Sequence, residues 1–267
     1  MPAAANWSVR LPNDGKVSYR GVVGFDQAGT GGGAILYPAP GAVGLLVAVL
    51  THGAIVESAK NAQKEKMQTD ANMVLSSYQD ALNSFDSREL MRRAADKASS
   101  PARARLLEPT EDPGQDMVIH SVPVFSMTQD QKAIVLDNTI GIQMPGAVAT
   151  AAYQSTIRVV SAVKEVEDPL TFWTGNNGEK LKDESAQLVA ESLGIALQEI
   201  AVSAKTESFP YRTVRYREGA TEKMERAQVI STRCDRLLIR TLRGQLMSVP
   251  TALVSAQGCV TVASDSK

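Results

Sequence analysis

Two histidines and two cysteines are the residues of this chain best suited to bind a metal or to act as nucleophile and base. His52 precedes Glu57 by five residues, whereas two ligands on one helical face are four residues apart. His120 alternates with apolar residues, as in a strand. Cys234 and Cys259 belong to no CxxC pair and have no neighbouring histidine. We interpret both histidines as structural, and we expect no metal, no cofactor and no catalytic residue.

The two cysteines leave two alternatives open. They are either buried reduced thiols or a single disulfide that joins the last strands of the chain. In the chain-entropy model, a loop of that length would stabilise the fold by roughly 3–4 kcal/mol. A disulfide between Cys234 and Cys259 would also indicate an oxidising compartment.

A glycine-rich segment at residues 28–33 follows a predicted strand, which is the position of a phosphate-binding loop. No Lys-Ser or Lys-Thr pair follows it, so the Walker pattern is not met. The dinucleotide pattern requires a helix directly after the loop, and Pro38 and Pro40 prevent one there. We therefore expect a loop without a nucleotide.

Composition and charge exclude several classes of function. The chain of 267 residues has 43% hydrophobic and 21% charged residues, which is typical of a globular protein. It has 28 Lys and Arg against 29 Asp and Glu, a net charge of -1, so no overall basic field would attract nucleic acid. Aromatic residues make up 5%, too few to favour stacking on bases.

The thirty residues between Asp26 and Glu57 carry no charge, and residues 41–56 are almost entirely apolar. A bilayer, a partner or the protein's own core could remove this segment from water. A membrane-spanning helix needs about 20 apolar residues, and sixteen residues reach only about 24 Å. For association with a partner, the candidate interaction residues are Leu46, Val49, Leu50, His52 and Ile55.

The first half of the chain predicts mainly helix. After a first strand at residues 17–25, one long helix, which could be broken in the middle, is expected from Gly41 to about Phe85. A second helix follows, with Asp86 or Ser87 as its N-cap, and ends before Pro101.

The second half predicts mainly strands, with an amphipathic helix at residues 183–205 and a loop at 168–178. The expected strands follow one another through short turns, which favours antiparallel pairing, and lie at residues 117–125, 132–143, 153–163, 211–217, 223–232, 236–241, 245–249 and 259–263. We therefore expect an α+β fold in which a long N-terminal helical segment packs with a mainly antiparallel β-sheet. The predicted segments are 1–112, with the helices, and 113–267, with the sheet.

Arginines cluster near the C-terminus. Arg236 and Arg240 share one face of a predicted strand, and Arg243 follows them at a turn. Further arginines on the neighbouring predicted strands could extend a basic sheet face, at positions Arg212, Arg215, Arg217 and Arg226. Such a face would either pair across strands with Glu218, Glu222 and Glu225 or bind an anionic partner such as lipid headgroups or an acidic protein.

Several short phrases resemble uncharacterised proteobacterial cell-envelope proteins, many of which carry lipoprotein leaders. They lie at residues 36–43, 51–53, 57–60, 221–226, 234–236 and 241–244. The resemblance implies export but no activity and no catalytic residue. The printed sequence lacks the leader and the lipidated cysteine of that group.

These observations favour a non-enzymatic structural or interaction protein of the cell envelope, in the periplasm or at the outer membrane, with a cytoplasmic location left open. It would work through association of the apolar segment and a β platform. Its partner would be a protein or a second copy, with the membrane surface as a further candidate and nucleic acid excluded. The alternatives are a module that binds lipid or a small apolar ligand, and an enzyme whose site is assembled in space.

Overall fold

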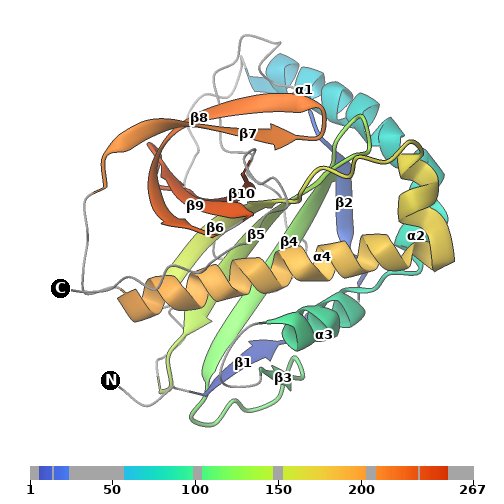
Figure 1. The fold of residues 1–267 in the computed structure, drawn as a ribbon. Helices are drawn as coiled ribbons and strands as arrows, with labels where there is room; N and C mark the ends of the chain where they lie inside the picture. Colours follow the sequence, from blue (N-terminus) through green and yellow to red (C-terminus); the bar gives the residue numbers. More distant parts are fainter. Residues whose placement is uncertain are drawn as a thin grey trace.

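Strands from along the whole described chain form one large mixed sheet in the computed structural model (Figure 1). The structure describes residues 6–13, 15–23, 57–98, 104–146, 153–202, 209–233 and 235–251. The helical elements are α1 (Glu57–Asn72), the 3-10 helix η2 (Met73–Tyr78), α2 (Gln79–Asn83), α3 (Ser87–Lys97) and α4 (Pro169–Val202). The strands are β1 (Trp7–Arg10), β2 (Ser18–Gly21), β3 (Arg105–Leu107), β4 (Met117–Met127), β5 (Ile134–Gln143), β6 (Tyr153–Val160), β7 (Tyr211–Glu218), β8 (Thr221–Thr232), β9 (Arg236–Thr241) and β10 (Leu246–Pro250).

Within the described ranges, the strands follow the order β3-β1-β4-β5-β6-β10-β9-β8-β7. β2 is not part of this order and pairs with β4. Neighbours joined by short turns are antiparallel, as in β4 with β5 and β7 with β8. Segments far apart in sequence pair in parallel, as in β1 with β4 and β6 with β10. Strands from both predicted segments, 1–112 and 113–267, therefore pair in one sheet.

Pro123 lies inside the central strand β4, where a missing N–H would normally break a ladder. On one side it lies opposite Asn138 of β5. On the other side β1 pairs with residues 117–119 and β2 with residues 124–127. The proline therefore occupies the gap between two short strands that share one edge of β4.

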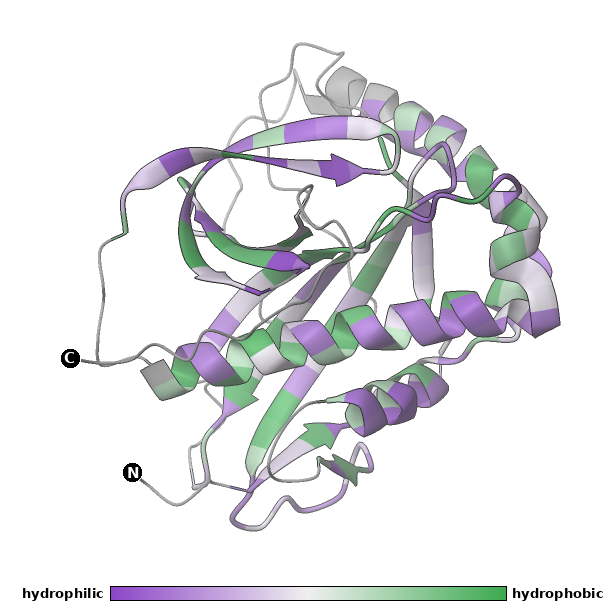
Figure 2. Ribbon diagram, viewed as in Figure 1, coloured by the Kyte–Doolittle hydropathy of each residue, from purple (hydrophilic) through white to green (hydrophobic). Residues whose placement is uncertain are grey.

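The main core lies between the sheet and the helices α3 and α4. Leu136, Ile140 and Ile142 of β5 are buried in the same hydrophobic cluster as Leu193 of α4. Asn138 lies on the same side, and its Nδ2 donates a hydrogen bond to Ser192 Oγ of α4 at 2.8 Å. Figure 2 shows hydrophilic and hydrophobic residues alternating along α4, as expected of an amphipathic helix on a sheet.

The sheet curls so that β7 and β8 arch over the side opposite α4 (Figure 1). A second hydrophobic cluster fills this curl, and it includes Val135 and Val160 from the central strands and Val214 and Tyr216 from β7. A bulge in β8 between Val229 and Ser231 lies within the curved part. Bulges increase strand bending, which fits this position.

The expected fold class is wrong. In place of a long N-terminal helix on a mainly antiparallel sheet, the structure has a large mixed sheet, and no long N-terminal helix occurs in its described part. The expected helix from 41 to 85 lies outside the described residues up to 56, and beyond that it is divided into α1, η2 and α2. Within η2, Met73 is 71% exposed while Leu75 and Tyr78 are buried. Among the described helices, the longest is α4, in the second half of the chain.

The predicted start of the second helix is confirmed. Asp86 is the N-cap of α3, and its side chain accepts a hydrogen bond from the backbone N–H of Glu89 at 2.7 Å. This bond satisfies one of the free donors at the start of a helix.

Candidate interaction surface

Most of the residues predicted to interact lie outside the described ranges. These are Leu46, Val49, Leu50, His52 and Ile55. The two cysteines of the candidate disulfide, Cys234 and Cys259, also lie outside them. Their predicted roles stay predictions. The structure does place the three predicted arginines, on β9 and in the turn that follows it.

Arg236 joins three strands. Its guanidinium donates hydrogen bonds to Ser248 Oγ and Ser248 O of β10, both at 2.9 Å, and to Val160 O of β6 at 2.7 Å. The side chain is only 13% exposed. Burial lowers the pKa of Arg236 to about 10, although Asp235 acts in the opposite direction. The guanidinium of Arg236 therefore binds partners within the sheet.

Arg240 lies on the same face of β9, and this face is turned toward α4. Its Nη2 donates to Glu199 Oε2 of α4 at 2.6 Å. Glu191, two turns earlier on α4, binds Arg233 and accepts a hydrogen bond from Ser248 Oγ at 3.0 Å. The carboxylates of α4 therefore bind the arginines of this face, whereas Arg243 is exposed in the β9–β10 turn.

The arginines of the β7–β8 ribbon are more exposed. Tyr216 and Val214 of β7 point into the second core cluster, so the residues between them point outward. We call the outward side the outer face of the ribbon, which consists of Tyr211, Thr213, Arg215 and Arg217 of β7 and Glu222, Met224, Arg226 and Gln228 of β8.

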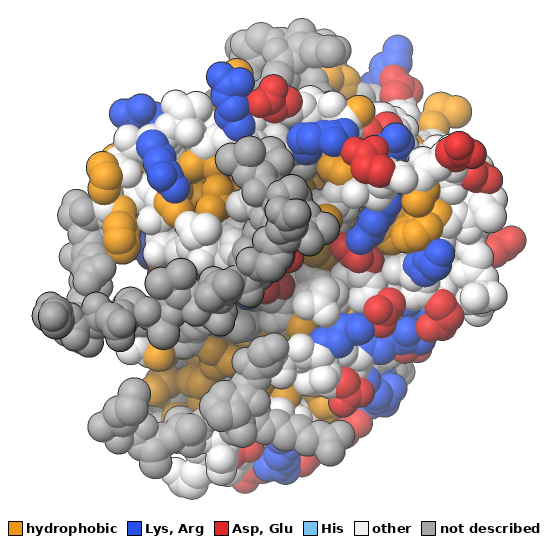
Figure 3. Space-filling view, in the orientation of Figure 1, with side chains coloured by type: hydrophobic (Ala, Val, Ile, Leu, Met, Phe, Trp, Pro, Cys, Tyr) orange, Lys and Arg blue, Asp and Glu red, His pale blue; other side chains and the backbone are white. Residues whose placement is uncertain are grey.

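The outer face combines positive charge with exposed apolar side chains. The side chain of Arg215 is 65% exposed, and it lies opposite Met224, which is 63% exposed. Tyr211 is 40% exposed at the start of β7. Figure 3 shows Lys and Arg side chains gathered over the upper left of the molecule, where the ribbon runs in Figure 1.

An open hollow of about 320 Å³ lies near the hairpin end of the ribbon. Its lining residues are Arg215, Tyr216, Arg217, Ala220 and Glu222. Arg215 Nη1 is 3.5 Å from Glu222 Oε1, and both side chains are more than half exposed. An ion pair of this length and exposure contributes little to stability.

The tip of the ribbon is fixed to the β4–β5 turn. Asp130 in that turn accepts hydrogen bonds from Thr128 Oγ1 at 2.6 Å, from the N–H of Lys132 at 3.1 Å and from the N–H of Ala220 in the β7–β8 turn. Gly219 has a φ of +61°, and a Cβ there would collide with the Asp130 carboxylate. Only glycine therefore suits this contact.

A second ion pair supports the same contact. Arg217 Nη1 donates to Glu165 Oε1 at 2.7 Å, which lowers the pKa of Glu165. Together with Asp130, Glu165 holds the ribbon against the rest of the sheet. We call the two contacts, Asp130–Ala220 and Glu165–Arg217, the tip contacts.

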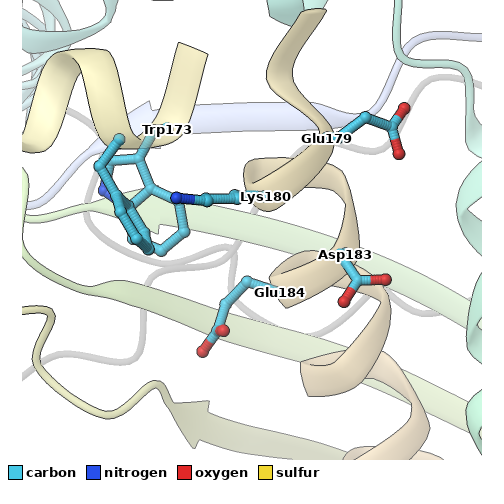
Figure 4. A pocket seen from close by; sticks show the side chains of 6 residues that line it. Trp173, Glu179, Lys180, Asp183 and Glu184 are labelled. Atoms are coloured by element: carbon cyan, nitrogen blue, oxygen red, sulfur yellow. The ribbon is translucent and has the colours of Figure 1, made fainter. Parts of the chain in front are cut away.

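A cleft of about 450 Å³ lies where α4 bends (Figure 4). Non-helical φ and ψ values at residues 175–178 produce the bend. The lining residues are Phe172, Trp173, Glu179, Lys180, Asp183 and Glu184.

Charges in this cleft are already bound within the chain. Its three carboxylates pair with cations of α3 or of the segment between β6 and α4: Glu179 with Arg93, Asp183 with Lys97 and Glu184 with Lys164. Lys180 Nζ lies 4.1 Å from the centre of the Phe172 ring, which is a cation–π contact. In Figure 4 Lys180 points toward the rings, while the acidic side chains extend from other sides of α4.

His120 is half-buried on β4, and its Nε2 lies 3.2 Å from Gln143 Oε1 of β5. This contact fits the structural interpretation of that histidine. Among the residues that the structure describes, no group of three or more His, Cys, Asp or Glu could hold a metal ion. The described helices also include none that is both long and apolar enough to cross a membrane.

Comparisons with protein-family models, with curated proteins and with solved structures give no match for this chain.

Proposed function

We propose that this chain is a non-enzymatic protein of the bacterial cell envelope that works by association with a partner. The observation that supports this best is the outer face of the β7–β8 ribbon, which exposes Arg215 beside Met224 on a paired and fixed ribbon. Exposed apolar side chains among arginines are typical of interaction surfaces.

The sequence gives independent support for association. Residues 41–56 are apolar and uncharged in a chain whose charges are otherwise balanced. Removing such a segment from water is favourable, whatever covers it. The envelope location rests on the resemblance of the short phrases described above.

The ribbon can serve as a platform because it is held at both ends. The tip contacts fix its hairpin end, and the pairing of β8 with β9 joins it to the main sheet. A surface that is already ordered loses little conformational entropy when a partner binds.

A module that binds a small ligand is the alternative function. The cleft at the bend of α4 favours it, because about 450 Å³ lies within the range of small-molecule sites. The ring of Phe172 in the cleft would suit an apolar or cationic group, provided that Lys180 moved away.

Light scattering of the full chain with and without detergent tests the association proposal. We expect a self-associated species that detergent dissociates, because the segment 41–56 would be covered by another copy or by detergent. The double variant Leu46→Asp with Val49→Asp should give a monomer with an unchanged far-UV circular dichroism spectrum. A wild-type chain that stays monomeric at all concentrations, and does not bind detergent, would contradict the proposal.

A further inference from the structure

We infer that the outer face of the β7–β8 ribbon binds the surface of an anionic phospholipid membrane. This inference rests on the proposed function, association in the envelope, and names the partner at the ribbon. The observation behind it is the arrangement of Arg215, Arg217 and Arg226 with Met224 on one side of two paired strands.

The charge of the outer face suits an anionic partner. Three of its eight residues are arginines and one, Glu222, is acidic, so the formal charge is 3 − 1 = +2. The chain as a whole has a net charge of -1, so the positive potential is local to this face. Clusters of basic side chains of this kind attract anionic lipids at short range.

The hollow between the arginines suits a phosphate group. Arg215 and Arg217 both line it, and a guanidinium can bind phosphate oxygens with two parallel hydrogen bonds. Glu165 already binds Arg217 at 2.7 Å and would stay in place as part of the tip contacts. The anion that competes at Arg215 is Glu222, which lies 3.5 Å from Arg215 and is 57% exposed. A phosphate could therefore displace it at little cost.

The apolar residues of the face favour lipid over an acidic protein. Met224 is 63% exposed and projects from a twisted ribbon among arginines. A protein partner would need a matching pocket for it, whereas a lipid surface deforms around any side chain. Tyr211 is 40% exposed, and tyrosine is enriched at the level of lipid headgroups.

Sedimentation with vesicles tests the inference with the full chain. The probes are vesicles of phosphatidylcholine alone and of phosphatidylcholine with phosphatidylglycerol, at low and high salt. We expect binding to the anionic vesicles only, and weaker binding at high salt because the charges are exposed.

The variant that tests the ribbon is Arg215→Glu with Arg226→Glu. Neither residue takes part in the tip contacts, and both are exposed. Reversing two charges should lower partitioning to anionic vesicles by at least about 30-fold, since each basic residue near such a surface contributes about fivefold. Arg92→Glu is the control for a single charge reversal elsewhere, because Arg92 is exposed on α3, away from the ribbon, and should lower partitioning much less.

Three results would overturn the inference. The first is unchanged vesicle binding by the ribbon variant, and the second is an equal loss with Arg92→Glu. The third is binding to poly-glutamate but not to vesicles, which would indicate an acidic protein partner. In each of these cases the proposed function is tested separately, by the light scattering of the Leu46→Asp and Val49→Asp variant, whose substitutions are not in the ribbon.

Discussion

Arg158 of β6 and Asp137 of β5 lie directly opposite each other and form a two-pronged ion pair. Arg158 Nε donates to Asp137 Oδ1 at 2.7 Å, and Nη2 donates to Oδ2 at 2.8 Å. Arg20 of β2 adds a third contact to the same carboxylate at 3.1 Å. The carboxylate is only 10% exposed, so two guanidinium groups share one nearly buried anion.

The effects on the two arginines differ. Burial would lower the pKa of Arg158, but the hydrogen bonds and charge of Asp137 outweigh it and raise that pKa above its usual value. For Arg20 burial is the larger effect, and it lowers the pKa despite the attraction of Asp137.

Replacing Asp137 with Asn should destabilise the fold by about 2–4 kcal/mol, because it removes the nearly buried anion that both guanidinium groups share. The lower half of this range allows for the 32% exposure of Arg158. Urea denaturation of the variant measures the change. Thr139→Val, two residues further along β5, is the control and should change stability by less than about 0.5 kcal/mol. Equal stability of Asp137→Asn and wild type would contradict the interpretation.

The Asp130 contact at the ribbon tip should make stability depend on pH in the acid range. Burial alone would raise the pKa of Asp130, but hydrogen bonds from Thr128, Lys132 and Ala220 together lower it below the usual 3.8. A lowered pKa contributes stability above the unfolded value, and this contribution is lost as the pH falls through the folded value. Wild type should therefore lose this stabilisation below about pH 4.

The variant Asp130→Asn checks this prediction. At pH 7 it should be less stable than wild type by about 1 kcal/mol, since an amide oxygen accepts these hydrogen bonds more weakly. Chemical denaturation at a series of pH values measures both proteins. The difference should shrink as the pH falls below 4, and a constant difference would show that Asp130 does not titrate with folding.

Strands with one polar and one apolar side are the part of this fold that the sequence predicts well. The alternation in β7 placed Val214 and Tyr216 on one side and Arg215 on the other, as the structure has them. The strands β1 and β3 could not be predicted in this way. They are three or four residues long, and β1 pairs with segments about a hundred residues away, as in Ser8 with Arg105.

The start of α4 carries a sequence signal for a helix N-terminus. Residues 168–178 were predicted as a loop, but α4 begins at Pro169, and Asp168 Oδ1 accepts a hydrogen bond from the N–H of Thr171 at 3.0 Å. Aspartate followed by proline is typical of a helix start. The predicted loop is correct only around Asn176 and Asn177, whose positive φ values interrupt the helix.

The environment of the arginines on β9 could be determined only from the tertiary structure. The sequence indicates that Arg236 and Arg240 share a face of β9, but not that α4 covers that face. Their environment is set by Glu191 and Glu199, which lie about forty residues earlier in the chain. No local pattern relates residues at that separation, whereas the exposure of Arg215 follows from strand alternation alone.

The two alternatives for Cys234 and Cys259, a disulfide or free thiols, can be distinguished by alkylation with mass measurement. If the two thiols are bonded, the native protein unfolded without reductant should take up no alkyl group, and after reduction it should take up two. Reduction should also lower stability by roughly 3–4 kcal/mol in the chain-entropy model. Two alkyl groups without reductant would instead establish free thiols and remove the cysteine evidence for an oxidising compartment.

Gly21 lies at the end of β2, in the contact between β2 and α1, and we expect that no larger residue can replace it without loss of stability. A Cβ at this position would overlap the backbone carbonyl of Ala71, and backbone atoms cannot move aside as a side chain can. Gly21 also binds α1 through its own backbone, since its N–H donates to Asn72 Oδ1 at 2.9 Å and its carbonyl accepts from Gln68 Nε2 at 3.0 Å.

Gly21→Ala should therefore destabilise the protein by about 1–3 kcal/mol or more. Gly194→Ala is the matched control, because nothing lies within 4 Å of a Cβ there and α4 should gain about 0.5–1 kcal/mol. Thermal unfolding of both variants measures the contrast, and a Gly21→Ala variant as stable as wild type would contradict the close packing of β2 on α1.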